Sequence, residues 1–284
     1  MCPSEPRPDR TGKSRLARGC YVPVDDRERL AARCAAILNA VTTDSTIVLT
    51  TAAQLRGLWL PILPEDVHVA TTEFGVRGRA MTRTRRPEFV AHRYQLTASD
   101  REVVFGIPVP TLPVLWVQLA RVLSLPDLVA AGDSALRMGT SLADLKAVVA
   151  RFTGCRGARL ARAALPLLDS RSESRPESHL RLAVAGPDLP VFDVNVNVYR
   201  RDGGWLARPD LSLEAARLAL EYQGEEHGTV SRMRKDLTRF ADLRREGWLV
   251  LPYGPAEVFG RPDEIHAEVR VEVRRRAPQL LCHE

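Results

Sequence analysis

The segment "RPDLSLEAARLALEYQGEEHG", residues 208–228, contains two apolar runs that each carry a carboxylate. We predict two strands here, "WLARPDLSL" with Asp210 near its middle and "ARLALEY" with Glu221 near its end. Neighbouring antiparallel strands are only about 5 Å apart, so these carboxylates can meet across the ladder. Gln223 is two residues beyond Glu221 and therefore points to the same side of the strand. The three positions form one candidate face.

The elements around this segment alternate between helical and extended patterns. A helix "ESHLRLAVAG" precedes the strand "PVFDVNVNVYR", and the turn at Asp202-Gly203-Gly204 gives a strong hairpin signal. After "ARLALEY" come a helix "SRMRKDLTRFADLRREG", a strand "WLVLPY" and a helix "PDEIHAEVRVEVRRR". The order αβββαβα predicts an α/β domain with a mixed sheet over residues 172–284.

The rest of the chain predicts a second domain. Residues 1–22 are polar and aperiodic, and we interpret them as a disordered or truncated lead-in. Residues 23–168 combine a capped helix, the strand patterns "DVHVATT" and "FVAHRYQL", and several amphipathic helices, as expected of an α+β domain. The polar run "DSRSESRPES" at 169–178 marks the boundary.

Composition limits the classes of protein. The 284 residues carry a formal charge of +6, which attracts polyanions such as DNA without identifying one. No apolar run approaches the roughly 20 residues of a membrane span, and no signal peptide is recognisable, so we expect a cytoplasmic protein without a membrane partner. The five scattered cysteines indicate neither a zinc knuckle nor a disulfide framework.

Two groups of basic residues are candidate DNA contacts. Arg83, Arg85 and Arg86 lie in a Gly- and Arg-rich connection, and Arg234 and Lys235 lie on the predicted helix after Gln223. Arginine and lysine bind phosphate oxygens and position a protein on DNA. A solvated loop is the more common explanation of the first group, and ordinary pairing along a helix explains charges of the second kind.

Asp210 and Glu221 are the candidate metal ligands. A divalent ion that cleaves phosphodiesters needs oxygen ligands that converge on one open site, where it polarises the phosphate and activates a water. Mg²⁺ or Mn²⁺ would suit such ligands. The alternative is that both residues are solvent-facing carboxylates at strand edges.

The pattern also resembles a known family. Pro209-Asp210, ten intervening residues and Glu221-Tyr222-Gln223 are similar to the signature of the PD-(D/E)XK nuclease superfamily, whose core has the same αβββαβ order. More narrowly, "ALEYQGEEH" and "RKDLTRFADLRREGWLVL" resemble a domain of uncharacterised bacterial proteins related to very-short-patch repair endonucleases. The matching positions from about residue 173 onward are Glu177, Asp210, Glu221, Gly224, His227, Asp236, Arg239, Gly247 and Trp248.

This resemblance implies a restriction-endonuclease-like fold and further site residues. Glu177 would reach the metal from the opening helix, although an acid at a helix N-terminus also has a dipole explanation. His227 would serve as an acid or base near the metal, although a turn histidine is an equal alternative. Gln223 departs from the pattern, because the narrower family mostly has Asp there and the superfamily mostly Lys. A neutral amide coordinates a metal or orients a water without adding charge.

The N-terminal half resembles AbiEi-like antitoxin proteins less specifically. The similar segments are "RLARGCYVPVDD", "TTAAQLRGLWLP" and "GIPVPTLPVLWVQLARVLSLPDLVAAGDSALR". In such proteins a winged-helix module precedes the first segment, and here the chain begins too close to it for a full module.

Two functions therefore stand as expectations. The first is a Mg²⁺-dependent DNA endonuclease that uses Asp210 and Glu221, assisted by Glu177, Gln223 and His227. The second is a non-catalytic DNA-binding or toxin–antitoxin regulatory protein that keeps a nuclease-like scaffold and has a protein partner. A protein-interaction module with neither activity is a third possibility.

Overall fold

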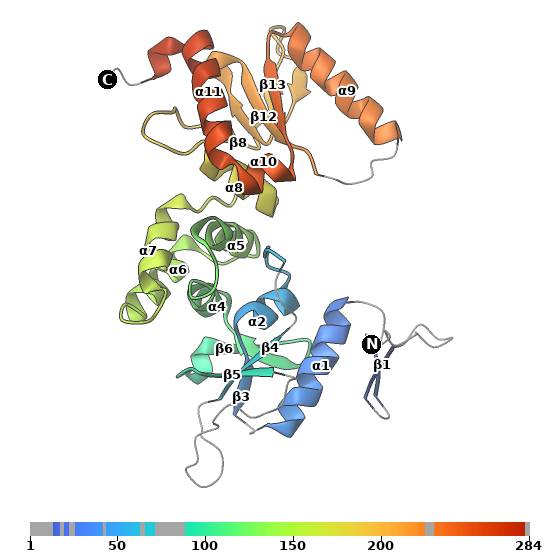
Figure 1. Cartoon of the computed structure of the whole chain (residues 1–284), viewed down its shortest axis with the longest axis vertical. Coiled ribbons are helices and arrows are strands. Elements are labelled where there is room, and N and C mark those ends of the chain that lie inside the picture. Colours follow the sequence, from blue (N-terminus) through green and yellow to red (C-terminus); the bar gives the residue numbers. More distant parts are fainter. Residues whose placement is uncertain are drawn as a thin grey trace. The chain divides into compact units, whose positions relative to one another are not determined.

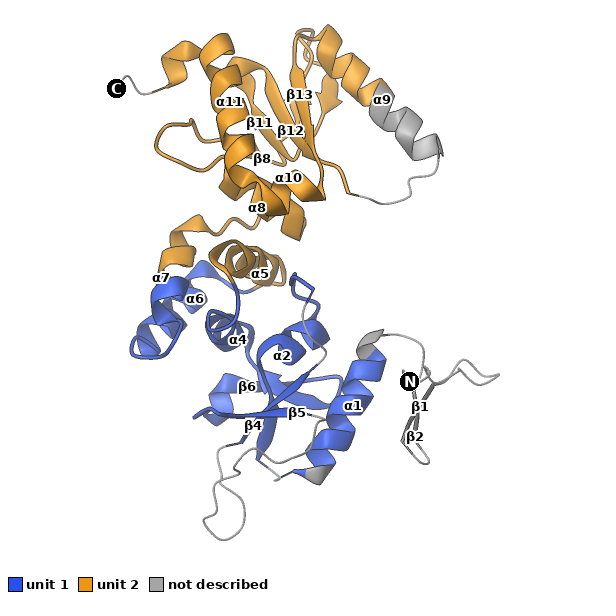
Figure 2. Cartoon of the chain, in the orientation of Figure 1, with its two compact units in different colours: residues 1–123, 140–162 blue, residues 124–139, 163–284 orange. Residues whose placement is uncertain are grey.

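The computed structural model describes residues 14–17, 20–22, 26–41, 44–62, 66–71, 89–224 and 230–281. Over 14–22, at 26–27 and 40, and over 230–237, the description covers the backbone alone. Two compact units divide the chain: unit 1 is 1–123 with 140–162, and unit 2 is 124–139 with 163–284 (Figure 2). The fold class is α/β with mixed sheets.

The division into units differs from the predicted domains at residues 163–168, which belong to unit 2, and at one helix. Helix α5 (Leu125–Arg137) falls within the predicted domain 23–168, but it belongs to unit 2 by its contacts. Helix α8 (Arg175–Ala183) is its main neighbour. Sequence order did not reveal this, because the contacts that hold α5 are made by residues much further along the chain.

Unit 1 is built on a three-stranded mixed sheet. β4 (Val67–Thr71) is central, with β3 (Ser45–Ile47) antiparallel to it and β5 (Phe89–Arg93) parallel to it. β6 (Arg101–Val104) and β7 (Ile107–Pro110) form a separate hairpin. The alternation seen in "DVHVATT" thus corresponds to a strand whose residues are largely buried.

Helices complete unit 1. α2 ends where Gly57 adopts a left-handed conformation with φ 74° and donates its N–H to the carbonyls of Ala53 and Gln54. One core cluster joins the sheet to α2 and α4, and contains Val48, Leu49, Ala70, Leu96 and Val114. The helices described in this unit are α1 (Asp26–Ala40), α2 (Leu49–Arg56), α4 (Leu112–Leu119), α6 (Leu142–Arg151) and most of α7 (Ala158–Ala164), whose last two residues belong to unit 2.

The predicted lead-in is not wholly without secondary structure. β1 (Ser14–Ala17) and β2 (Cys20–Val22) pair antiparallel, with Arg15 opposite Tyr21. A pair this short closes by local backbone hydrogen bonds, so it needs no long apolar pattern.

Unit 2 contains a four-stranded mixed sheet in the order β13-β12-β11-β8. β11 pairs antiparallel with both β8 and β12, whereas β12 and β13 run parallel. The strands are β8 (Asp193–Val194), β11 (Leu211–Leu213), β12 (Leu218–Tyr222) and β13 (Leu249–Tyr253). The predicted strand "ARLALEY" is therefore confirmed as β12.

Helices cover both faces of this sheet, with α11 (Pro262–Arg276) and α9 (Val230–Arg245) on opposite sides of the strands (Figure 1). On one face, Leu218 and Leu220 of β12 join a core with α8, α10 (Pro255–Gly260) and α11. On the other, Ala219 packs with Leu243 of α9. Because side chains alternate along a strand, Glu221 lies on the α9 face.

The two predicted strands before β12 are each divided. "PVFDVNVNVYR" yields only β8 and β9 (Val198–Tyr199), and "WLARPDLSL" yields only β10 (Trp205–Ala207) and β11. β9 and β10 form a hairpin separate from the main sheet. Asn195 has a φ of 52°, which interrupts the first strand, and Pro209 has no N–H to extend the second. Asp210 therefore precedes β11 and is not in the middle of a strand.

A buried carboxylate joins α5 to α8 within unit 2. Asp133 is fully buried, accepts hydrogen bonds from Ser178 Oγ and Arg181 at 2.7 and 2.8 Å, and also accepts one from the N–H of Asp169 at 2.7 Å. Burial raises the pKa of Asp133, and the Arg181 guanidinium opposes that rise. The network compensates a charge that burial alone would make very costly.

Replacing Asp133 by Ala should therefore lower the free energy of unfolding by about 3 kcal/mol, because Arg181 would be left largely buried without its carboxylate. Urea denaturation of the full chain measures this change. Glu214→Ala, at an exposed position of the same unit, is the control and should shift stability by no more than about 0.5 kcal/mol. Equal effects of the two substitutions would contradict the structural role of Asp133.

Candidate functional site

Asp210 lies at the entrance to β11, opposite Glu221 of β12. Leu211 pairs with Leu220, and continuing this antiparallel register by one residue sets Asp210 across from Glu221. The Oδ2 atom of Asp210 accepts a hydrogen bond of 2.7 Å from the N–H of Tyr222. Its backbone carbonyl accepts another, 3.0 Å long, from the N–H of Asn195. The expected meeting of the two carboxylates on one side of the sheet agrees with this register.

The surroundings of Asp210 disfavour its ionised form. Burial raises the pKa of this carboxyl to about 6, and the negative charges of Glu177 and Glu173 add to the rise. The hydrogen bond from Tyr222 and the charge of Arg239 act in the opposite direction without cancelling it. Such a pKa is typical of functional carboxyls, although structural networks also produce it.

Glu221 is paired with an arginine from α9. It is 5% exposed, and both guanidinium nitrogens of Arg239 lie 3.1 Å from its carboxylate oxygens, one on each. The Nη2 atom of Arg239 donates a hydrogen bond to Oε2 of Glu221, and Nη1 adds a close charge contact with Oε1 that lacks hydrogen-bond geometry. The sequence placed Arg239 among the positions of the family resemblance, and its partner across the layers was missed.

Glu177 is held at the start of α8. It completes the cap of this helix, because its N–H donates to Ser174 Oγ and its Oε1 accepts from the same hydroxyl at 2.8 Å. Its Oε2 accepts from the side-chain amide of Asn195 at 2.7 Å. Asn195 thus ties Glu177 to Asp210, since its own N–H bonds the carbonyl of Asp210. Sequence reasoning missed Asn195, whose left-handed conformation has no clear sequence signal.

The remaining predicted site residues are only partly covered. Gln223 is exposed and continues the parallel pairing with β13 through its N–H, which donates to the carbonyl of Tyr253 at 2.8 Å. His227, Arg83, Arg85 and Arg86 lie outside the described residues. Arg234 and Lys235 are placed on α9 by its backbone alone. Of the five predicted catalytic positions, the structure therefore brings together Asp210, Glu221 and Glu177, with Gln223 beyond the end of β12.

The fit of this site to a divalent ion is partial. Asp210 and Glu177 supply hard oxygen atoms, and the raised pKa of Asp210 shows that its charge is incompletely compensated, a deficit that a cation would remove. Arg239, however, already neutralises Glu221. Within the described part of the chain, no three carboxylate, imidazole or thiolate groups are arranged to hold a metal. The residues fit a weakly held ion with Asp210 as its main ligand.

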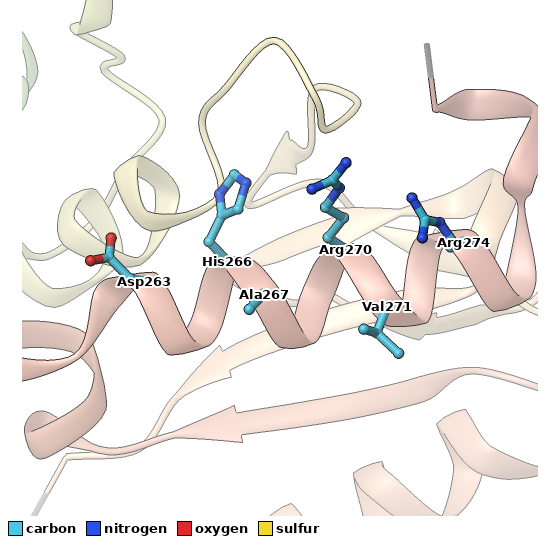
Figure 3. Close-up of a pocket in the computed structure, with 6 residues that line it drawn as sticks. All are labelled: Asp263, His266, Ala267, Arg270, Val271 and Arg274. Carbon is cyan, nitrogen blue, oxygen red and sulfur yellow. The ribbon is translucent and has the colours of Figure 1, made fainter. Parts of the chain in front are cut away.

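A groove of about 360 Å³ lies elsewhere in unit 2, along α11 (Figure 3). Its polar lining comes from Asp263, His266, Arg270 and Arg274, which project to one side of the helix. Two of these already have a partner, because His266 and Arg270 both contact Asp188, at 3.1 and 3.5 Å. The groove shares no residue with the Asp210 site.

The chain resembles two known proteins over about half its length. Both are described as uncharacterized proteins of Mycobacterium tuberculosis, from the strains CDC 1551 and H37Rv, and both are 34% identical over 155 residues. The aligned part is 54% of this chain and 57% of each relative, so the chain spans little more than half the length of these relatives. No protein-family model matches the chain, and no solved structure does.

None of the helices in the described ranges has both the length and the apolar character that a bilayer crossing requires.

The pKa of Asp210 predicts a pH-dependent stability in metal-free buffer. Its folded value of about 6 lies above the ordinary 3.8, so the folded chain holds the proton more tightly and the free energy of unfolding falls as pH rises between these values. Asp210→Asn removes this contribution, and the variant should gain on wild type by about 1 to 3 kcal/mol between pH 4 and 7. Urea denaturation across this pH range measures the difference. A pH-independent difference would contradict the assignment.

Proposed function

We propose that unit 2 is a divalent-metal-dependent DNA endonuclease domain with a restriction-endonuclease-like fold. The observation that carries the proposal is the alignment of Asp210 with Glu221 by the β11–β12 register, in surroundings that raise the pKa of Asp210. The element order and the sequence resemblance to very-short-patch repair endonucleases support the same assignment. Hydrolysis of a phosphodiester bond is the proposed reaction.

Each residue has a role in this proposal. Asp210 and Glu221 hold Mg²⁺ or Mn²⁺, and Glu177 adds negative charge from the start of α8. The bound ion would polarise the phosphate and lower the pKa of a water ligand. Gln223 accepts a hydrogen bond from that water or orients it through its amide, and His227 transfers a proton. Arg83, Arg85, Arg86, Arg234 and Lys235 contact the DNA backbone.

Arg239 sets the condition for this activity. Its guanidinium and a metal ion compete for Glu221, because both need the same carboxylate oxygens. If Arg239 moves toward a DNA phosphate, Glu221 becomes available to the ion, and DNA and metal bind cooperatively. Binding of either ligand would then favour the other by the same factor.

A second function is favoured by the same pair. If Arg239 stays on Glu221, that carboxylate is unavailable to a metal ion and the neutral Gln223 adds no charge, which suits a scaffold without catalysis. Unit 2 would then act in a DNA-binding or toxin–antitoxin regulatory protein, as the AbiEi-like segments of the N-terminal half suggest. Such a protein would bind DNA or a protein partner without cutting DNA.

Cleavage of supercoiled and mismatched DNA with Mg²⁺ or Mn²⁺ separates the two functions. Wild type should nick DNA, and Asp210→Ala and Glu221→Ala should each reduce the rate at least about 100-fold because each removes an ion ligand. Glu214→Ala, a matched loss of an exposed carboxylate in the same unit, should retain activity. Equal cleavage by all four proteins would indicate contamination and exclude the endonuclease.

Gln223→Asp tests the metal site directly. Gln223 is exposed, so the fold should accept the substitution, and the new carboxylate should tighten Mg²⁺ binding about 10-fold by adding an anionic ligand. Titration calorimetry measures the affinity, with the neutral Gln223→Asn as the matched control that should not tighten it. Tighter binding without cleavage would favour the scaffold, whereas no binding by any of the three proteins at millimolar concentration would refute the metal site.

A further inference from the structure

The β9–β10 hairpin presents two aromatic residues to solvent. Tyr199 and Trp205 are opposite one another in the ladder and are 50% and 59% exposed. Their neighbours Val198 and Leu206 are buried and belong to the core under α9. One side of the hairpin is thus anchored in unit 2, and the other side presents two large apolar rings.

The turn of this hairpin is held by hydrogen bonds. The N–H of Arg200 donates to the carbonyl of Gly204 at 2.8 Å, and the N–H of Gly203 donates to the carbonyl of Arg200 at 3.0 Å. Asp202 Oδ1 accepts from the N–H of Gly204 at 2.9 Å. Gly203 has a φ of 86°, a conformation in which a side chain would be strained. The positions of the two aromatic residues are therefore defined before any ligand arrives.

The indole of Trp205 is also oriented. Its Nε1–H donates to Asn197 Oδ1 at 3.1 Å, so the polar edge of the ring is satisfied while much of the ring stays exposed. A ring that is already ordered loses little conformational entropy when it binds a flat partner.

Positive charge accompanies the rings. Arg200 and Arg201 directly follow Tyr199, and both are exposed. The Arg200 guanidinium is 3.8 Å from Asp242, a loose contact, and Arg201 has no ion-pair partner among the described residues. An arginine next to an exposed aromatic ring offers a phosphate contact beside a stacking surface.

We propose that this hairpin is a stacking platform for unpaired bases of single-stranded DNA, with Tyr199 and Trp205 as the stacking residues and Arg200 and Arg201 as the phosphate contacts. The inference rests on the proposed function for its choice of DNA as the ligand. β10 ends at Ala207, three residues before Asp210, so the platform is connected to the acidic site by a very short segment.

The size of the surface argues for bases over a protein partner. A fully buried aromatic side chain covers about 150–250 Å². Two half-exposed rings therefore provide well below the roughly 800 Å² that each partner contributes to a standard protein interface. The same area suits one or two nucleotides, because each has a flat base that can stack on a ring and a phosphate that a neighbouring arginine can contact.

Fluorescence anisotropy of a labelled single-stranded oligothymidine, in EDTA and low salt, tests the platform in the full chain without any need for cleavage. Removing each ring should weaken binding about 10-fold, and Tyr199→Ala/Trp205→Ala should weaken it further. Trp205→Phe should restore most of the affinity because it keeps a stacking ring. Phe105→Ala is the matched control, since Phe105 is an exposed aromatic residue of unit 1, 56% exposed, at the β6–β7 turn.

The outcomes separate this inference from the proposed function. Ring-dependent binding by both wild type and Asp210→Ala supports the platform, even if neither protein cuts DNA and the endonuclease fails. Equal binding by wild type and the double variant overturns the platform, as does a wild type that binds no oligothymidine. A change of oligomeric state in the double variant without loss of DNA binding would assign the rings to a second copy of the chain, which also overturns it.

Discussion

The antiparallel pairing of β11 with β12 is the constraint on which the rest of unit 2 depends. It places Leu211 against Leu220, so the apolar side chains of both strands meet the helices of one face. The start of β11, next to Asp210, therefore lies beside the end of β12, which carries Glu221. A register shift of one residue would reverse the burial of every side chain in β12, so Asp210 and Glu221 are held opposite each other by the core. The strand pairing that stabilises the sheet consequently also fixes the positions of the two carboxylates.

The acidic site is electrostatically uneven although both carboxylates lie on one side of the sheet, because Arg239 of α9 directly contacts only Glu221 of the two. Glu221 lies toward α9 and meets a guanidinium, whereas Asp210 receives one backbone N–H and the repulsion of nearby carboxylates. A proton, a metal ion or a displaced arginine would each relieve the same excess of negative charge. The properties of this region therefore depend on which cation binds Asp210, and on whether that cation also breaks the ion pair between Glu221 and Arg239.

The sequence predicted those features that depend on local pattern. The apolar run "ARLALEY" identified β12, and the antiparallel pairing expected of it placed Glu221 across from Asp210. It could not show that Arg239 reaches Glu221, because helical periodicity tells which side of α9 is apolar and not which strand residue that side meets. The interruption of the first predicted strand has the same origin, because the left-handed Asn195 is stabilised by contacts with Glu177 and Arg171, which are distant in sequence. The interruption of the second strand at Pro209, by contrast, depends on a residue that is visible in the sequence.

The placement of α5 in unit 2 affects the order in which the protein can be completed during synthesis. Asp133 leaves the ribosome 45 residues before Ser178, one of the groups that bind it, and residues 140–162 of unit 1 are made in between. The nascent chain therefore carries α5 without its partner helix while residues of the other unit are being made. Asp133 lies on the face of α5 that α8 later covers. Because burying a carboxylate without hydrogen-bond partners is costly, Asp133 disfavours the packing of this face against other segments before α8 has been made. Asp133 in this way serves the growing chain as well as the finished one.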